Sequence, residues 1–252
     1  MTSTMTKRSR ILGFLMAPAL ALVLAGCVTT AAAPKKPAKI TGSYVLLTSE
    51  EGRKRINRST HRVDYNSLMA TFTTQERQTL CSVATGVSIL NALPLERPVD
   101  PKYKPYAFFT QANYFNDRVE SIVDRPTTLR IGQTLEQAAK VMAVHGAKTR
   151  HFHAADSSAA EFRRIAKRNM AEKNNFVAIN YRRNYVGQPP GAHFSPLGAY
   201  DEATDSFLIL DVARYKFPPV WVPAEDLFRA MNTMDSDSGK TRGFIVVSAR
   251  SH

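Results

Sequence analysis

From residue 175 onward the chain consists largely of short runs of apolar, β-branched and aromatic residues, and these runs constrain the fold more than any other feature. They read FVAINYR, HFSPLGAY, SFLILDV and GFIVVSA. Such residues are enriched in strands, and only the five residues DEATD separate the second run from the third, which favours a hairpin. We therefore expect an antiparallel sheet in the C-terminal half.

The residues before this region carry helical signals. Apolar residues recur at helical spacing over residues 81–91 with small residues between them, as in a helix packed closely among neighbours. Thr134 and Ser158 are each followed three residues later by Gln or Glu and then by an apolar stretch, which is the signature of a capping box. One more amphipathic stretch covers residues 224–231. The sequence thus predicts an α+β domain with the helices first and the sheet after them.

The start of the chain has the features of a secretion signal. Basic residues precede an apolar run over residues 11–25, which is too short to be a stable membrane span. The run ends in Leu-Ala-Gly-Cys27, which resembles a bacterial lipobox, where the cysteine takes a diacylglycerol and the chain is cut before it. We expect a signal peptide at 1–26, a lipidated Cys27 with a flexible tether over 27–56, and a catalytic domain at 57–252. An unmodified cysteine in an ordinary signal is the alternative.

The chain carries a formal net charge of +13, and removal of the signal leaves most of this surplus in place. A positive surface favours nucleic acid, an anionic membrane face or small acidic substrates as partners. The sequence has no zinc-finger spacing, no aromatic RNA-binding signature and no long basic run, so we expect no nucleic-acid partner.

Cys81 is one of only two cysteines in the chain. If Cys27 is lipidated, Cys81 is the single thiol of an exported protein, and no intramolecular disulfide can form. Such a thiol is either a small buried apolar side chain or a group retained for its reactivity, and counting cysteines does not separate the two interpretations.

The predicted hairpin brings a histidine close to an aspartate. If Tyr200 faces Ser206, then Ser195 faces Asp211, and His193 lies on the same face of its strand two residues from Ser195. His193 and Asp211 are then diagonal neighbours within side-chain reach. The alternative is a surface histidine and an aspartate that caps a turn.

With Cys81 at the start of a helix, this pair supplies the parts of an activated nucleophile. The helix dipole lowers the pKa of the thiol, His193 takes the thiol proton, and Asp211 holds the imidazole in the required tautomer. Attack by the thiolate on a carbonyl leaves an oxyanion. We expect its donors to be the backbone N–H of Cys81 and the side-chain amide of Gln75 or Gln78.

Two parts of the chain resemble the phytochelatin synthase family almost position by position: TQERQTLCSVA with LNAL, and HFSPLGAYDEATDSFLILDVARYKFPPVWVPAEDLFRAM. The resemblance covers about residues 57–248. It implies a papain-like cysteine peptidase fold with the nucleophile on a central helix. It also implies a catalytic triad of Cys81, His193 and Asp211, with Gln75 in the oxyanion hole.

The resemblance further implies substrate-binding residues. Arg183 and Arg242 match positions that in this family hold the glutamyl and carboxylate groups of the substrate, a task suited to the planar fork of arginine. Ser82 and Ala192 stand where the family usually has glycine, so we expect either a slightly narrower pocket or a slightly shifted backbone. The sequence has no counterpart of the cysteine-rich C-terminal region of the plant enzymes. We therefore expect no metal bound by the protein itself, and a Cd or Zn ion only as a thiolate complex of the substrate.

The implied activity is cleavage of glutathione. The Cys81 thiolate attacks the carbonyl of the Cys–Gly bond, glycine leaves, and a γ-glutamylcysteinyl thioester forms. Water then gives γ-glutamylcysteine, and a second glutathione gives phytochelatin. Because short bacterial members resemble hydrolases more than synthases, we expect hydrolysis to dominate.

The expected setting is the periplasmic side of a membrane, reached as a lipoprotein, with a role in the response to heavy metals. Glutathione and the membrane are the expected partners, and the oligomeric state is left open, with a homodimer as one option. A general papain-like cysteine peptidase and a non-catalytic lipoprotein whose thiol binds a metal or a partner are the alternatives.

Two further motifs are weaker. His151 and His153 have an alternate spacing that could ligate a metal, but no acidic or cysteine residue lies close in the sequence, so histidines of an exposed strand are favoured. Asp235, Asp237 and Gly239 are arranged partly like a calcium loop, but the later Glu is missing, and a solvated turn is favoured.

Overall fold

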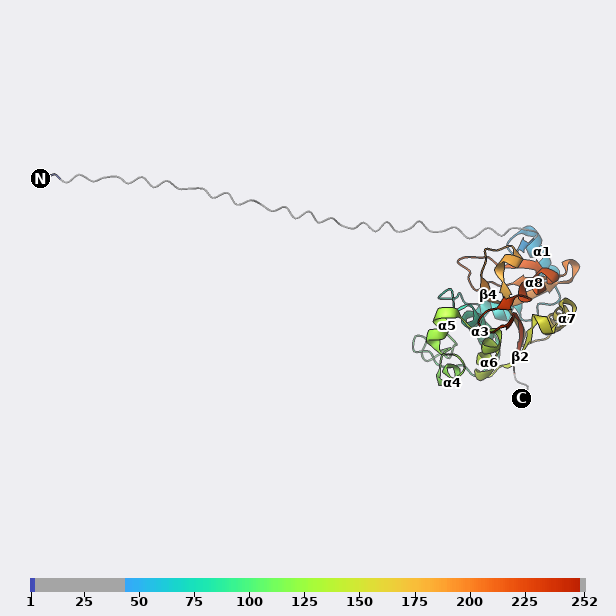
Figure 1. The fold of residues 1–252 in the computed structure, drawn as a ribbon, viewed down its shortest axis with the longest axis horizontal. Coiled ribbons are helices and arrows are strands. Elements are labelled where there is room, and N and C mark those ends of the chain that lie inside the picture. Colours follow the sequence, from blue (N-terminus) through green and yellow to red (C-terminus); the bar gives the residue numbers. More distant parts are fainter. Residues whose placement is uncertain (3–43, 250–252) are drawn as a thin grey trace. The chain divides into compact units, whose positions relative to one another are not determined.

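A computed structural model describes residues 1–2 and 44–249 of the chain. The predicted signal peptide, Cys27 and most of the predicted tether lie outside these residues. Residues 44–249 form an α+β domain, as the sequence predicted (Figure 1). None of the helices in the described part is both long enough and apolar enough to cross a bilayer.

An antiparallel sheet forms the centre of this domain. Within residues 44–249 it has seven strands in the order β1-β6-β5-β4-β3-β9-β2, and a separate two-stranded sheet pairs β7 with β8. The strands are β1 (Val45–Leu46), β2 (Lys148–His153), β3 (Asn175–Arg182), β4 (Ala192–Asp201), β5 (Ser206–Ile209), β6 (Val220–Pro223), β7 (Met234–Asp235), β8 (Lys240–Thr241) and β9 (Gly243–Ser248). The four runs that the sequence indicated correspond to β3, β4, β5 and β9. The strands β1 and β6 were not anticipated.

The helices are α1 (Glu50–Arg58), α2 (Tyr65–Thr71), α3 (Cys81–Ala92), α4 (Asp117–Glu120), α5 (Arg125–Ile131), α6 (Leu135–Val144), α7 (Ala159–Ala171) and α8 (Ala224–Met231). The predicted helices over residues 81–91 and 224–231 are therefore confirmed. Thr134 forms the full capping box with Gln137, whereas the Ser158 hydroxyl accepts the N–H of Glu161 without a reciprocal bond. The capping signals in the sequence thus marked true helix starts.

The sheet is covered by helices on both faces. Successive residues of β3 point to opposite sides, as they must in a strand. Phe176 and Ala178 pack in one apolar cluster with residues of α3 and α6, whereas Val177 and Ile179 pack in a second cluster with residues of α7 and α8. The three layers explain why the central strands are apolar on both faces, and they hold the start of α3 against β4.

The domain boundary predicted at residue 57 differs from the structure. Val45 of β1 pairs with Trp221 of β6, and α1 begins at Glu50, so folded structure precedes the predicted start. A Cβ on Gly52 would lie 1.9 Å from the backbone oxygen of Leu46, so α1 packs directly on the end of β1. A strand of two residues carries no periodicity, which is why the tether was predicted to be too long.

Candidate active site

Cys81 is the first residue of α3, where the helix dipole places partial positive charge beside the thiol. Its backbone N–H is among the first of the helix, which have no intrahelical partner. The helix is held in place by close packing, since a Cβ on Gly86 would lie 2.5 Å from the hydroxyl of Tyr114. Cys81 itself is 9% exposed, so the thiol lies at the edge of the core with one side accessible.

His193 and Asp211 are in direct contact. His193 lies in β4 and Asp211 follows β5, and Nε2 of the imidazole donates to Oδ1 of the carboxylate at 2.8 Å. Both side chains are buried. The contact that the sequence predicted is present, and it leaves Nδ1 of His193 as the nitrogen available to the thiol.

The strand register that produces this contact differs in part from the predicted register. Tyr200 pairs with Phe207 and not with Ser206, so the register beside the turn is shifted by one residue. A bulge at Gly198 then restores the expected register, because Leu197 faces Ile209 and the N–H of Leu210 donates to the oxygen of Pro196 at 3.0 Å. A one-residue shift moves every side chain to the other face of a strand. Without the bulge, Asp211 would therefore point away from His193.

Arg183 lies behind this pair. Its Nη1 and Nη2 atoms donate to the two oxygens of Asp211 at 2.6 and 3.0 Å, and Nη1 also donates to the side-chain oxygen of Gln188. The guanidinium lies 4.3 Å from the ring centroid of Phe217, and the residue is 5% exposed. The sequence-based expectation that Arg183 contacts the substrate needs correction, because its donors are engaged in the protein interior.

The electrostatics of the three groups are coupled. Burial raises the pKa of the Cys81 thiol, but the hydrogen bond and charge of His193, together with the N–H of Phe194, outweigh it and bring this pKa below its usual value. Burial lowers the pKa of His193, but the charge of Asp211 outweighs it and raises this pKa overall. Burial also opposes ionisation of Asp211, yet His193 and Arg183 hold its pKa far below the usual range. The arrangement thus favours a thiolate beside an imidazolium.

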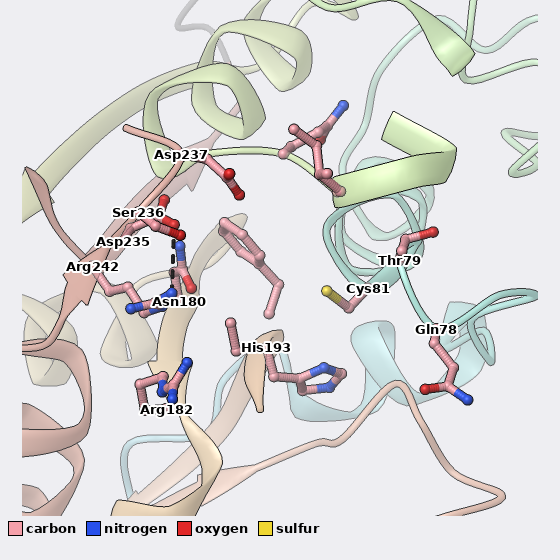
Figure 2. A pocket seen from close by; sticks show the side chains of 15 residues that line it. Gln78, Thr79, Cys81, Asn180, Arg182, His193, Asp235, Ser236, Asp237 and Arg242 are labelled. Atoms are coloured by element: carbon pink, nitrogen blue, oxygen red, sulfur yellow. Dashed lines mark hydrogen bonds and ion pairs between the residues drawn. The ribbon is translucent and has the colours of Figure 1, made fainter. Parts of the chain in front are cut away.

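A hollow of about 270 Å³ opens beside Cys81 and His193 (Figure 2). Its walls carry side chains of both charges. Besides Cys81 and His193, the lining residues are Gln78, Thr79, Ile131, Gly132, Gln133, Asn180, Arg182, Ala192, Phe194, Asp235, Ser236, Asp237 and Arg242. Two arginines and two aspartates in so small a space suit a zwitterionic ligand.

Some polar atoms of this hollow have no partner in the described part of the chain. They include Oδ1 of Asn180 and Nε of Arg242, both buried. Burial lowers the pKa of Arg242. Its Nη1 donates to the backbone oxygen of Met234, and its Nη2 lies 3.4 Å from Oδ1 of Asp235, which leaves Nε as the donor without a partner. A ligand with a carboxylate would stabilise this guanidinium.

Arg242 therefore lines the hollow, and its role in substrate binding stays a prediction. Arg182 also lines the hollow and is the residue that sequence reasoning missed. The side chain of Arg182 forms no hydrogen bond or ion pair with residues 44–249, unlike the side chain of Arg183 beside it. Neighbours at a strand end point in different directions, so only one of two adjacent arginines can face the hollow. Two adjacent arginines look alike in the sequence, so the sequence could not indicate which of them faces the hollow.

The two candidate amides for an oxyanion hole lie in different settings. Gln78 lines the hollow, whereas Gln75 is buried, and its Nε2 donates to the hydroxyl of Tyr215 at 3.0 Å. Oε1 of Gln75 has no partner within the described residues. The backbone N–H of Gln75 donates to the oxygen of Val212 at 2.9 Å, which ties this segment to the residue after Asp211.

Residues 44–249 contain no group of three or more His, Cys, Asp or Glu side chains arranged to hold a metal ion. The rings of His151 and His153 contact each other edge to face, with their centroids 5.6 Å apart. His153 is buried and so differs from the exposed strand histidine that we expected.

A thiol at a helix N-terminus, an imidazole beside it, a carboxylate behind the imidazole and a polar hollow in front define a candidate site for acyl transfer through a cysteine. The sequence model of the family described as "Phytochelatin synthase" matches residues 36–244. The chain therefore belongs to the phytochelatin synthase family.

Curated relatives carry the name glutathione gamma-glutamylcysteinyltransferase. The chain is 35% identical over 188 residues to protein 1 of Lotus japonicus, covering 72% of this chain and 35% of that one. It is 33% identical to protein 1 of Arabidopsis thaliana, a match that covers 72% of this chain and 36% of that one. It is 31% identical to the Schizosaccharomyces pombe protein, a match that covers 73% of this chain and 43% of that one. The chain spans about a third of the length of the plant relatives.

Proposed function

We propose that this protein cleaves glutathione at the Cys–Gly bond through a thioester on Cys81. The observation that carries the proposal is the row of Cys81, His193 and Asp211 beside a hollow that is lined by both arginines and aspartates, in a chain of this family. The relatives are named for transfer of a γ-glutamylcysteinyl group from glutathione. Their papain-like fold is part of the proposal.

In the first step the Cys81 thiolate attacks the carbonyl carbon of the Cys–Gly bond. The carbonyl oxygen becomes an oxyanion, for which the backbone N–H of Cys81 and the Gln75 amide are the proposed donors. The imidazolium of His193 gives its proton to the nitrogen of the leaving glycine, and the C–N bond breaks. Asp211 keeps Nε2 of the imidazole protonated throughout, and Arg183 keeps Asp211 ionised and in place.

The γ-glutamyl end of glutathione carries an α-carboxylate and an α-ammonium group, and the hollow offers a partner for each. Arg242 and Arg182 suit the carboxylate, whereas Asp235, Asp237 and Oδ1 of Asn180 suit the ammonium. This arrangement supports a zwitterionic substrate over a general peptide chain, which would bring no such head group.

In the second step His193 removes a proton from the attacking nucleophile. Water gives γ-glutamylcysteine, the outcome that we propose to dominate, and the amine of a second glutathione gives phytochelatin. A Cd or Zn ion enters as a thiolate complex of the substrate. We further propose that the protein acts outside the cytoplasm as a lipoprotein attached through Cys27, because of the Leu-Ala-Gly-Cys sequence that ends its apolar N-terminal run.

Mass spectrometry after rapid acid quench tests the proposal. Glutathione should add the mass of γ-glutamylcysteine less one water to the wild-type protein, with release of glycine, and Cys81→Ala should show neither. An unmodified wild-type protein that still releases glycine would exclude the covalent route. Cleavage of ordinary peptides in place of glutathione would favour a general cysteine peptidase.

A further inference from the structure

A loop between α3 and α4 exposes aromatic side chains away from the candidate active site. Residues 101–108 are all exposed and read PKYKPYAF, and we call them the aromatic loop. Tyr106 is 76% exposed, and Tyr103 and Phe108 are exposed as well. An open hollow of about 660 Å³ lies in this loop. It is lined by Lys102, Tyr103, Lys104, Tyr106, Ala107 and Phe108.

Backbone hydrogen bonds hold the aromatic loop in its shape. The N–H groups of Tyr103 and Tyr106 donate to the backbone oxygens of Asp100 and Tyr103 at 3.0 and 2.9 Å. The N–H of Phe108 donates to the oxygen of Pro98 at 2.9 Å, which closes the base of the loop. The rings of Tyr103 and Phe108 also contact each other edge to face. The aromatic side chains are therefore presented to the outside by a loop of defined conformation.

The charges of this region are sorted between its inside and its outside. Asp100, at the base of the loop, is buried, and its two oxygens accept the N–H of Lys102 at 2.8 Å and the hydroxyl of Thr110 at 2.6 Å. The Lys102 ammonium lies 5.3 Å from the ring centroid of Tyr103, and neither Lys102 nor Lys104 forms an ion pair within residues 44–249. The exposed side chains of the aromatic loop thus carry positive charge only.

Exposed aromatic residues interleaved with lysines are typical of a surface that contacts a bilayer. Tyrosine rings settle at the level of the lipid headgroups, where the ring is in apolar surroundings and the hydroxyl in polar ones. Lysines beside them are attracted by anionic headgroups. We propose that the aromatic loop is a membrane-contact surface that inserts its aromatic side chains among the headgroups of an anionic bilayer.

A second copy of the chain fits this surface less well than a bilayer does. In a symmetric dimer the same patch meets itself, so the lysines of one loop would face those of the other. A stable protein interface also needs about 800 Å² from each partner, formed by about 20–30 residues, and the aromatic loop has eight. A bilayer requires no shape complementarity, and its anionic headgroups complement the charge of Lys102 and Lys104.

The N-terminal sequence gives such a contact a purpose. Residues 28–43 separate Cys27 from the described domain, and a chain of this length spans at most about 55 Å. A domain attached through Cys27 would therefore stay close to the bilayer, and the aromatic loop would determine which side of the domain faces it. The inference adds a contact to the proposed attachment through Cys27, and it does not depend on the proposed cleavage of glutathione.

A fluorophore whose emission shifts to shorter wavelength inside a bilayer tests the inference. It is attached at Ala107→Cys in the full chain with Cys27→Ser and Cys81→Ser, so that it has a single thiol to react with and no attached lipid contributes. Vesicles of phosphatidylglycerol and phosphatidylcholine should shift the emission, and brominated lipid should quench it. Ala160→Cys in α7 is the matched control and should show neither effect. It is exposed, and α7 packs on the face of the sheet opposite to Phe109, the buried residue that follows the loop.

The charge requirement is tested with the same label. Lys102→Gln/Lys104→Gln should lower the ratio of inserted to free loop, measured from the emission, by about 25-fold, or about fivefold for each lysine. Lys148→Gln/Lys173→Gln removes the same charge from exposed positions outside the loop and should keep the original ratio.

Three results would overturn the inference. The first is an unchanged emission at position 107 on anionic vesicles, and the second is an equal shift at positions 107 and 160. The third is a shift that appears without lipid and grows with protein concentration, since a second copy would then cover the loop. Palmitate labelling of the protein with Cys27 intact tests the attachment separately, so failure of one proposal leaves the other standing.

Discussion

The thiol and the imidazole come from two regions that are built in different ways. Cys81 is placed by α3, a single helix whose position depends on packing around small residues such as Gly86. His193 and Asp211 are 18 residues apart in the sequence, and their contact depends on the register of a bulged hairpin. A small shift of the helix would move the thiol slightly, whereas a one-residue slip of the hairpin would remove Asp211 from the site. The imidazole side is therefore the more sensitive of the two.

The largest effect that distinguishes the two sides is expected for Asp211→Asn. The amide would favour the wrong tautomer of His193, so kcat for glycine release should fall by about 10⁴-fold. The change also leaves the buried Arg183 without its carboxylate, which should cost about 3–5 kcal/mol in the free energy of unfolding. Glycine release and denaturant unfolding measure the two effects.

Cys81→Ala is the matched variant on the thiol side. It should abolish activity but change the free energy of unfolding by only about 1 kcal/mol. In the double variant Asp211→Asn/Arg183→Gln, part of the lost stability should return without activity. If Asp211→Asn is as stable as Cys81→Ala, the two sides do not differ in the way described.

The oxyanion donors test the thiol side alone. Gln75→Ala should lower kcat by about 10²-fold to 10³-fold, as loss of one oxyanion donor does. Gln78→Ala is the control, because Gln78 lines the hollow from the same segment. A larger loss for Gln78→Ala would move the donor role to Gln78 and leave Gln75 as a link between the thiol segment and Val212.

The pH dependence of Cys81 reactivity tests how the imidazole side of the site acts on the thiol side. The pKa of Cys81 is lowered in the folded protein, so the thiolate is lost only as the pH falls through this lowered value. An ordinary thiol, with a pKa of about 8.5, is only a few per cent ionised at pH 7. Alkylation of wild-type Cys81 by iodoacetamide at pH 7 should therefore be up to about 30-fold faster than in His193→Gln.

The difference between the two alkylation rates should narrow as the pH rises, because the variant thiol, whose pKa burial raises, becomes ionised only at high pH. Denatured wild-type protein supplies the rate of a thiol without these contacts. Equal rates for wild type and His193→Gln at pH 7 would show that the helix dipole, and not the imidazole, activates Cys81.

The contrast between the regions also explains what the sequence could predict. The helix starting at Cys81 and the cap at Thr134 are local features, and local spacing predicted both. The contact of His193 with Asp211 was predicted from a register that is wrong beside the turn and right beyond Gly198. Which of Arg182 and Arg183 faces the hollow could not be predicted, because it depends on Asp211, which lies 28 residues after Arg183.

The last prediction tests the bulge itself. A Cβ on Gly198 would lie 2.9 Å from Cδ1 of Leu210, a fully buried side chain that directly precedes Asp211. Gly198→Ala should therefore displace Leu210, at a cost of about 1–3 kcal/mol in the free energy of unfolding, and lower kcat by about 10-fold through misplacement of Asp211.

Gly191→Ala is the control for Gly198→Ala in the same strand region, because its Cβ would meet only Cδ of Arg183 at 3.8 Å, an ordinary contact. Crystal structures of both variants would show the register directly. A Gly198→Ala enzyme with wild-type kcat and an unchanged contact between His193 and Asp211 would mean that the hairpin tolerates a Cβ at the bulge. The imidazole side would then be as robust as the helix that carries the thiol.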